Sequence, residues 1–501
     1  MRARWCWRGM TVMGVMMVMG CPGPIEPVKS IPDAGVEDMS GDTGMQVEAD
    51  MDARDVSNPG IPSQDLSACG DVSFSPDLSL CTASYLGGVG ADTVSHVEVA
   101  PDGSIVLGGV FPGVAGFGPL NNQLGLDGDA AVVKLSEDGL LIQAWTRVGL
   151  MVSSLDVSPL DGSIVVSGEY GLMAIEPSMK AIRFQVATHA AEVLDIGLGG
   201  EVLHIAGTKV TVLSGDSGAV LASFDVPEDH ISGGVIDSRH ERVIVTGFAQ
   251  VSGSLQQPYI RAYDFNGELV WSAWDWSAAE AQAYGSDTRG NAVTLGFDGK
   301  LYFVGEAHGG STVFGRDPMD LSKEARLTKT DTYSDPYDLN GAAPVGFISR
   351  HDLETGELEQ GTFLVTRLSS DNKGNAARPL HVAANERGQV MVGGVAACCI
   401  EDGESLTVEG SPAMPGYAGG AFIALFEGDD LSRSMWTALH GGAEVELKDV
   451  ATWGKVAVVA HEHVAEEGSA VVQGQMVTHE SFFAQPPGGP SDVHISVIPV
   501  D

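Results

Sequence analysis

The chain has 501 residues, of which 65 are glycine and only 7% are aromatic, a composition that suits many short strands joined by tight turns. Its 67 acidic residues outnumber 27 lysines and arginines, so the formal net charge is −40. An acidic excess of this size argues against nucleic-acid binding, which needs clustered lysine and arginine, and favours solubility, cation-rich surroundings or a basic partner.

The N-terminus has the pattern of an export signal. Three arginines lie within the first eight residues, and the apolar run over residues 10–19 is too short to span a bilayer. It ends in Val18-Met-Gly-Cys21, which resembles the bacterial lipobox, where a diacylglycerol is attached to the cysteine thiol. We predict a signal peptide over residues 1–20, a lipid anchor on Cys21, and a location in the bacterial cell envelope, at the outer membrane or cell surface. The alternative is an ordinary secretion signal with an incidental cysteine.

Residues 21–68 are predicted to form an acidic, disordered tether, because they are rich in proline, glycine, serine and acids and lack an apolar period. Such a chain has a root-mean-square span of roughly 35–40 Å, which holds the globular part off the membrane. Cys69 and Cys81 follow, and in an exported protein we predict a disulfide between them. The adjacent Cys398 and Cys399 either bridge each other or pair with that first set, and the sequence leaves both options open.

Residues 69–501 are predicted to form an all-β domain, a seven-bladed β-propeller. A unit of about 60 residues recurs seven times from about residue 82, and its clearest copy covers residues 86–149. Each unit holds four apolar strands, with turns such as Pro101-Asp-Gly-Ser104 whose Gly, Asp and Asn tolerate the positive φ of tight hairpins. The competing folds are a pair of β-sandwiches and a β-solenoid.

The turns also predict how the ring closes. Seven turns follow the first strands of the units, but only six follow the third strands, because the chain ends at Val493–Val500 without a fourth strand. Residues 83–88 resemble the fourth strands of the other units. We therefore expect the first strand of the domain to complete the last blade, which protects the sheet edges from aggregation.

The first unit resembles the seven-bladed β-propeller repeat of bacterial secreted proteins (SBBP-like repeats). The pattern of that family is Gly-Gly-x-Gly-x-Asp, an apolar strand with Asp-Gly, a strand ending in glycine, and then Asp-Ala-x-Val-x-Lys-Leu. Residues 86–149 match it closely, whereas the units near residues 151, 188 and 231 are eroded. The resemblance implies the propeller fold and a surface or extracellular context, and the family has no common activity to carry over.

In a propeller, the connections between the second and third strands share one face with the connections between blades. The second-to-third connections are long at about residues 112–128, 309–344, 396–419 and 463–491, and almost absent in units 2 and 3. Long loops on a rigid scaffold commonly carry binding residues, so we predict a ligand-binding face over blades 5, 6, 7 and 1. The alternative is loop drift without function.

Two inter-blade connections repeat one pattern, Ser286-Asp-Thr-Arg-Gly-Asn-Ala292 and Ser370-Asp-Asn-Lys-Gly-Asn-Ala376. Each offers a carboxylate, a cation and an amide at the same spacing, which predicts contact with a common ligand such as a glycan or a peptide. The alternative is a structural turn in which the aspartate accepts backbone N–H groups. The candidate ligand residues are Asp287, Arg289, Asn291, Asp371, Lys373 and Asn375.

The first strands of the units line the central channel of a propeller. Aligned on their turns, they place seven residues at one level: Glu98, Asp156, Asp195, Ile236, Thr294, His381 and Asp449. Like charges held close disfavour joint ionisation, so a ring of this kind predicts raised pKa values or a bound cation, with Ca²⁺ suited to oxygen ligands. The candidate metal ligands are Glu98, Asp156, Asp195, His381 and Asp449. In the alternative, these side chains bond turn amides between blades.

No nucleophile elbow, phosphate loop or dinucleotide fingerprint occurs in a strand context that would support it, and no catalytic residue or organic cofactor is predicted. We predict a lipid-anchored binding or scaffolding protein whose partners are the membrane, through its lipid, and a protein or glycan ligand, with no nucleic acid. The alternative is a metal-dependent hydrolase or lyase acting at the channel mouth, which rests on fold analogy alone.

Overall fold

The computed structural model describes residues 78–79, 82–88, 90–113, 120–227, 229–253, 255–328, 343–368, 370, 373–400, 406–408, 411–412, 419–441, 445–464 and 490–500. These belong to one compact unit, Asp55–Asp501. The predicted signal peptide, Cys21, the tether and the Cys69–Cys81 disulfide lie outside the described residues. No helix in the described part of the chain is long and apolar enough to cross a membrane.

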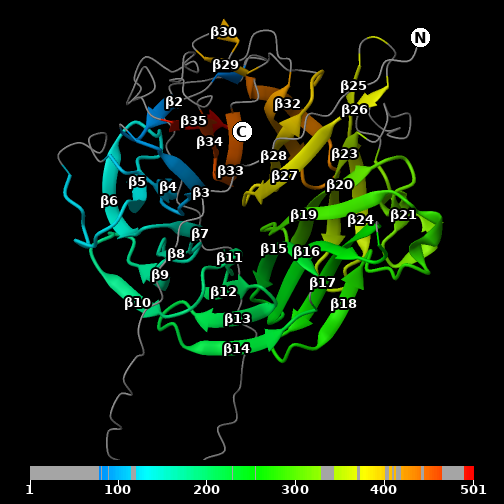
Figure 1. Cartoon of the computed structure of the whole chain (residues 1–501), viewed down its shortest axis with the longest axis horizontal. Coiled ribbons are helices and arrows are strands. Elements are labelled where there is room, and N and C mark those ends of the chain that lie inside the picture. The colour runs from blue at the N-terminus through cyan, green and yellow to red at the C-terminus, as the bar shows by residue number, and fades with distance from the viewer. Residues whose placement is uncertain are drawn as a thin grey trace, which may run out of the picture. The chain divides into compact units, whose positions relative to one another are not determined.

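The described residues form seven four-stranded antiparallel sheets arranged as the blades of a ring, which confirms the predicted propeller (Figure 1). From the inside outwards, blades 1 to 4 consist of β3 (Thr93–Val99), β4 (Ile105–Val110), β5 (Ala130–Leu135) and β6 (Ile142–Gly149); β7 (Val152–Val157), β8 (Ile164–Gly168), β9 (Gly171–Ile175) and β10 (Ile182–Val186); β11 (Val193–Ile196), β12 (Glu201–Ala206), β13 (Lys209–Ser214) and β14 (Val220–Asp225); and β15 (His230–Asp237), β16 (Arg242–Gln250), β17 (Gln256–Asp264) and β18 (Leu269–Ala273).

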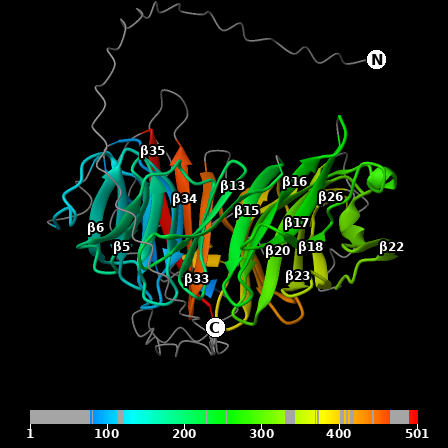
Figure 2. The same cartoon turned by 90° about the horizontal axis from the view of Figure 1, so that it is seen from below.

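The remaining blades have the same plan. Blades 5 to 7 consist of β19 (Asp287–Leu295), β20 (Lys300–His308), β23 (Pro344–Asp352) and β24 (Leu358–Leu364); β27 (Ala377–Ala384), β28 (Gln389–Ala396), β31 (Gly420–Glu427) and β32 (Arg433–Gly441); and β33 (Val445–Trp453), β34 (Val456–Val464), β35 (Ser491–Pro499) and β2 (Thr82–Leu86). Figure 2 views this ring from its edge, with β6 at one side and β22 at the other.

The ring closes through the first strand of the domain, as predicted. The outermost strand of blade 7 is β2, which runs antiparallel to β35 in a register from Thr82↔Val497 to Leu86↔Val493. Tyr85 is fully buried and meets the His494 ring edge-on, with 4.9 Å between the ring centroids. Both ends of the propeller sequence are therefore held in one sheet, in which β35 is paired on both sides.

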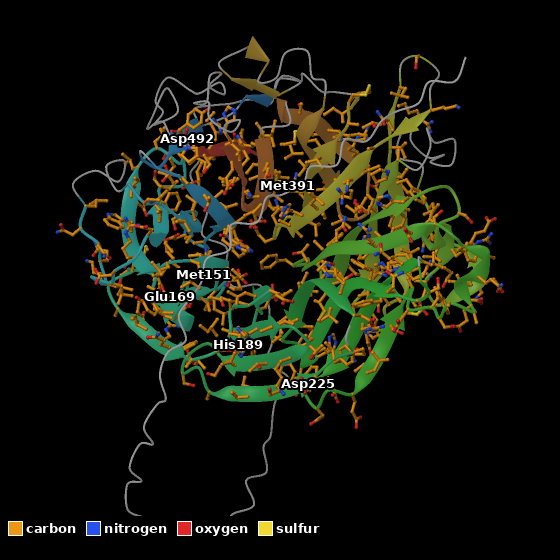
Figure 3. The ribbon with its side chains drawn as sticks, viewed as in Figure 1. Met151, Glu169, His189, Asp225, Met391 and Asp492 are labelled. Carbon is orange, nitrogen blue, oxygen red and sulfur yellow. A yellow bond between two sulfur atoms is a disulfide. The ribbon has the colours of Figure 1, made fainter. Side chains whose placement is uncertain are left out.

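The core lies between the blades, where side chains fill the space between neighbouring sheets (Figure 3). The largest cluster joins blades 4, 5 and 6 around Trp274, which is fully buried and contacts the rings of Phe303, Phe314 and Phe347. Glycine sets the blade spacing elsewhere, because a Cβ at Gly108 would lie 3.0 Å from side-chain carbons of Leu155 in blade 2.

A β-bulge interrupts the innermost strand at one register in six of the seven blades, the exception being the short β11. In three blades the extra residue donates a side-chain hydrogen bond to a backbone carbonyl of the next inner strand: Ser95 to Val152 at 2.9 Å, Ser232 to Gly290 at 2.7 Å and Asn291 to Pro379 at 2.6 Å. The bulge therefore frees a polar side chain to join neighbouring blades.

Connection lengths differ between blades as predicted. Only residues 169–170 and 207–208 separate the second and third strands of blades 2 and 3, whereas residues 309–343 and 397–419 separate them in blades 5 and 6. Within or beside these long connections lie short elements: β1 (Leu78–Ser79), η3 (Ala281–Ala283), η4 (Val313–Gly315), β21 (Arg316–Asp317), β22 (Asp320–Glu324), β25 (Thr366–Arg367), β26 (Gly374–Asn375), β29 (Leu406–Val408) and β30 (Ser411–Pro412). The face that carries them is called the loop-bearing face below.

Candidate functional site

A cavity of about 260 Å³ occupies the centre of the ring and is lined by the inner strands. Of the seven residues predicted to meet there, six contribute to its wall: Glu98, Asp156, Asp195, Ile236, Thr294 and Asp449. His96, which the turn-based alignment did not select, lines it as well. The sequence therefore identified one wall residue in every blade except the sixth, whose predicted residue, His381, does not line the cavity.

The acids form two layers and not the single ring that the alignment predicted. The lower layer holds Glu98 and Asp156, each three residues after the extra residue of its strand's bulge. Asp195 belongs to the same layer, because it occupies the same position relative to the hairpin turn that ends its strand. His381 and Asp449 directly follow their bulges, which places them level with His96 and nearer the loop-bearing face. In blade 4 the residue equivalent to Glu98 is Val235, so the alignment on turns selected Ile236 one residue too late. The extra bulge residue, invisible to an alignment on turns, causes the difference.

Most of the channel carboxylates accept backbone hydrogen bonds from the next blade. Asp156 accepts from the amide of Ile196, Asp195 from Ile236 at 2.7 Å, and Asp449 from Val97 at 3.1 Å. The last bond joins blade 7 to blade 1 across the seam of the ring. These contacts join the blades as the structural alternative for the acidic ring expected, but the donating amides lie in the inner strands and not in turns.

Glu98 differs from the other acids, because it accepts no hydrogen bond from any described residue. Burial raises the pKa of Glu98 well above its ordinary value, and the charges of Asp156, Asp449 and Asp195 raise it further. Burial likewise raises the pKa of Asp156 well above its ordinary value, with Asp195 adding to the effect. Burial raises the pKa of Asp195 to about 7, although the Ile236 amide opposes the shift.

The upper layer combines two imidazoles with one carboxylate. His381 Nδ1 lies 3.3 Å from Asp449 Oδ1, and His96 Nε2 lies 3.5 Å from the hydroxyl of Ser154. Burial lowers the pKa of His96, and the nearby His381 lowers it further, against the opposing charge of Asp449. The surroundings of His96 therefore favour its neutral form.

The geometry of the channel offers few free ligands for the predicted calcium ion. Among the described residues, no group of three or more His, Cys, Asp or Glu side chains is arranged to hold a metal ion. One oxygen of Asp156 also accepts from its own following amide, and Asp449 does the same. The oxygens of both carboxylates are thus engaged by the backbone, which leaves few lone pairs facing the cavity. Calcium binding stays a prediction.

On the loop-bearing face, the residues of the first repeated connection have protein partners. Asp287 accepts from the Gln256 amide at 2.9 Å, Arg289 donates through Nε to the Gln256 side chain at 2.5 Å, and Asn291 is the bulge residue that bonds Pro379. These residues lie in β19 and not in a loop. Asp287 accepts a backbone N–H group as the structural alternative for this motif expected, although it does so from a strand and not from a turn.

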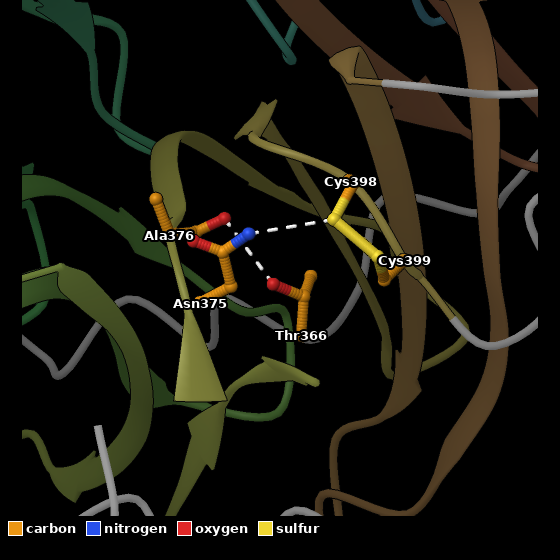
Figure 4. The surroundings of a disulfide bond; sticks show 5 residues. All are labelled: Thr366, Asn375, Ala376, Cys398 and Cys399. Atoms are coloured by element: carbon orange, nitrogen blue, oxygen red, sulfur yellow. Dashed lines mark hydrogen bonds between the residues drawn. A yellow bond between two sulfur atoms is a disulfide. The ribbon is translucent and has the colours of Figure 1, made fainter. Parts of the chain in front are cut away.

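The second repeated connection is only partly described. Asp371 lies outside the described residues. Asn375 belongs to β26 and donates through Nδ2 to the sulfur of Cys398 at 3.4 Å (Figure 4). Cys398 is bonded to Cys399, which decides between the two pairings considered for these cysteines. Lys373 is described at the start of this segment and makes an interaction of its own with the protein.

Three candidate functional residues were not predicted from the sequence: Glu306, His308 and Arg378. Glu306 is fully buried near the end of β20, where it accepts from Arg378 Nε at 2.6 Å and His308 Nε2 at 3.0 Å. Burial opposes its ionisation, but these bonds prevail and the pKa of Glu306 is lowered. An acid within the apolar strand Leu-Tyr-Phe-Val-Gly-Glu306 was the available signal, and His308 lies two residues further along the same strand, although Arg378 comes from β27.

Comparison with known proteins adds no identity: no protein-family model matches the chain, and no curated protein matches it. The resemblance to the bacterial propeller repeat therefore stays a prediction as to family, while the propeller fold itself is established by the strand order.

Proposed function

We propose that this chain is an exported, lipid-anchored protein of the bacterial cell envelope that binds a glycan or protein ligand through the loop-bearing face of its propeller. The single observation that carries the proposal is that the connections between the second and third strands differ greatly in length from blade to blade. The connections of blades 5 and 6 contain their own helical turn and strands, whereas two residues suffice in blades 2 and 3. A scaffold needs no such asymmetry for stability, and loops held on rigid strands are where binding residues concentrate.

The channel supports binding or structure better than catalysis. Three of its four acids are engaged by amides of a neighbouring blade, which joins the blades but leaves few free oxygens for a metal. The hydrolase or lyase alternative requires ligands converging on one point, and the described residues offer no such group. We therefore place the ligand on the loop-bearing face and assign Asp156, Asp195 and Asp449 to joining the blades.

Binding is tested with the mature chain without its predicted anchor cysteine, residues 22–501, on arrays of bacterial envelope polysaccharides and of peptides. The test variant replaces residues 309–343 by a two-residue turn copied from blade 2. The matched control is Asn266→Ala, in a hairpin turn on the opposite face. We expect array binding by the wild type and the control, and its loss in the shortened variant. Equal binding by the shortened variant, or no binding by the wild type, would contradict the proposal.

The lipid anchor is tested separately by labelling cells with an alkyne fatty acid. Cys21→Ser should abolish label incorporation, whereas Cys6→Ser, a cysteine within the predicted signal peptide, should leave it intact. Label that persists in Cys21→Ser would remove the anchor from the proposal without affecting the binding face.

A further inference from the structure

A basic cluster on the loop-bearing face lies between blades 5 and 6. Arg289 and Glu306 are cross-strand partners on β19 and β20, His308 ends β20, and Arg378 is the second residue of β27. The cluster is thus built on strands and not on loops, which fixes its members in place. We call Arg289, His308, Arg378 and Glu306 the arginine cluster.

The arginine cluster has more positive than negative charge, although the chain as a whole has 67 acidic and only 27 basic residues. One oxygen of Glu306, Oε1, is approached by Arg289 Nη1 at 3.4 Å, Arg378 Nη2 at 3.2 Å and His308 Nε2 at 3.0 Å. One buried carboxylate is therefore shared by two permanent cations and an imidazole. Asp287, the cross-strand partner of His308, is a further acid beside the cluster and accepts from the Gln256 backbone.

Several donors of the arginine cluster have no acceptor among the described residues. Arg289 uses Nε and Nη1, Arg378 uses Nε and Nη2, and His308 uses Nε2. Arg289 Nη2, Arg378 Nη1 and His308 Nδ1 are left over. The side chains of Arg289, Arg378 and His308 are 31%, 42% and 29% exposed respectively, so a ligand can reach all three. Guanidinium donors in a fixed fork match the oxygens of a carboxylate or phosphate.

An aromatic surface adjoins the arginine cluster. The Arg289 guanidinium lies 5.3 Å from the centre of the half-buried Phe248 ring, and the exposed His230 ring packs on Phe248 at 4.5 Å. These two rings, tilted by 36° to each other beside a charged fork, fit a sugar that bears a carboxylate, because the apolar face of the sugar can pack on a ring while its carboxylate reaches the arginines.

We propose that the arginine cluster, with Phe248 and His230 beside it, binds the carboxylate of an acidic sugar. This inference rests on the proposed function and names the ligand class of the same face. Glu306 holds the arginines in position and occupies them partly in the free protein. An incoming carboxylate takes the remaining donors and competes with Glu306 for the shared ones.

The test is calorimetric titration of the mature chain with trigalacturonate, with its methyl ester as the uncharged match. We expect the acid to bind and the ester to bind at least tenfold more weakly, because a charge-assisted hydrogen bond commonly contributes an order of magnitude or more in affinity. Arg289→Gln should weaken binding about tenfold, and it leaves Arg378 to neutralise Glu306. The matched control is Arg183→Gln, an arginine that also pairs with two carboxylates, Asp161 and Glu176, near the hairpin turns of blade 2.

Glu306→Gln gives a result that faulty folding cannot imitate. Removing the internal competitor should strengthen trigalacturonate binding several-fold, whereas a purely structural Glu306 predicts weaker binding or none. Inorganic phosphate should compete only weakly. Phosphate that binds as tightly as trigalacturonate would overturn the sugar assignment, and so would an ester that binds equally well. If trigalacturonate fails while array binding still depends on residues 309–343, this inference falls and the proposed function stands; if the arrays also fail, both fall.

Discussion

The channel carboxylate Asp195 gives the sharpest stability prediction. Asp195→Asn keeps an oxygen that can accept the Ile236 amide, which lies 2.7 Å from the native carboxylate, but it removes the ionisable group. Because burial raises the pKa of Asp195 from 3.8 to about 7, ionising it costs more in the folded chain than in the unfolded one. Its contribution to stability is therefore fully present below pH 3.8 and is lost progressively as the pH rises to about 7.

The size of the stability change follows from the difference between the pKa values of Asp195 in the unfolded and the folded chain. At about 1.4 kcal/mol per pH unit, the loss reaches roughly 4 kcal/mol above pH 7, of which about 2 kcal/mol accrues between pH 5.5 and 7. An unfolding entropy of about 2.1 cal/mol/K per residue converts each kcal/mol into roughly 1 °C for a unit of this length. We expect the melting temperature of Asp195→Asn, relative to wild type, to be about 2 °C higher at pH 8 than at pH 5.5.

The assay is differential scanning calorimetry of both proteins at pH 5.5, 7 and 8. The control is Asp264→Asn, in an exposed hairpin turn, where the hydrogen bond from the Glu268 amide, together with other turn donors, lowers the pKa of the carboxyl. This variant should show no gain at alkaline pH, since its carboxylate is favoured by folding. A melting difference for Asp195→Asn that stays constant from pH 5.5 to 8 would refute the reasoning.

Three further predictions concern the packing of the blades and the disulfide. Asp449→Ala removes the acceptor of the Val97 amide across the seam of the ring and should cost about 1–3 kcal/mol in chemical denaturation; an unchanged midpoint would contradict the inter-blade role. Trp274→Ala, at a fully buried site among three phenylalanine rings, should cost about 3–5 kcal/mol by the same assay; a loss below 1 kcal/mol would show a less tightly packed cluster. The double variant Cys398→Ser/Cys399→Ser should melt within about 1 °C of wild type, because a bridge between neighbours closes almost no loop; a drop of several degrees would assign the bridge a larger structural role.

The fold was predictable because each blade repeats a local signal. Turn residues recur between apolar strands, so the strands and their order follow from the sequence, and the missing last turn identified β2 as the closing strand. The lengths of the connections in blades 2, 3, 5 and 6 were equally visible, because they are distances along the chain.

The site was less predictable, because its contacts cross between blades. The single bulge residue Lys448 places Asp449 in the upper layer of the channel and not in the lower layer with Glu98. No pattern in the sequence predicts this bulge. Asn291 resembled a ligand residue but bonds Pro379, 88 positions away. Glu306 and Arg378 are 72 positions apart, so their ion pair could be recognised only in three dimensions.

The account depends most on ring closure, because closure determines which connections share the loop-bearing face. Hydrogen exchange of the mature chain, read by mass spectrometry, measures it directly. We predict that the amides of Thr82–Leu86 that face β35, their partner in the last blade, exchange far more slowly than those of an unfolded peptide. Exchange of Thr82–Leu86 at the rate of an unfolded peptide, while β35 remains protected, would contradict the closed ring and with it the placement of the binding face.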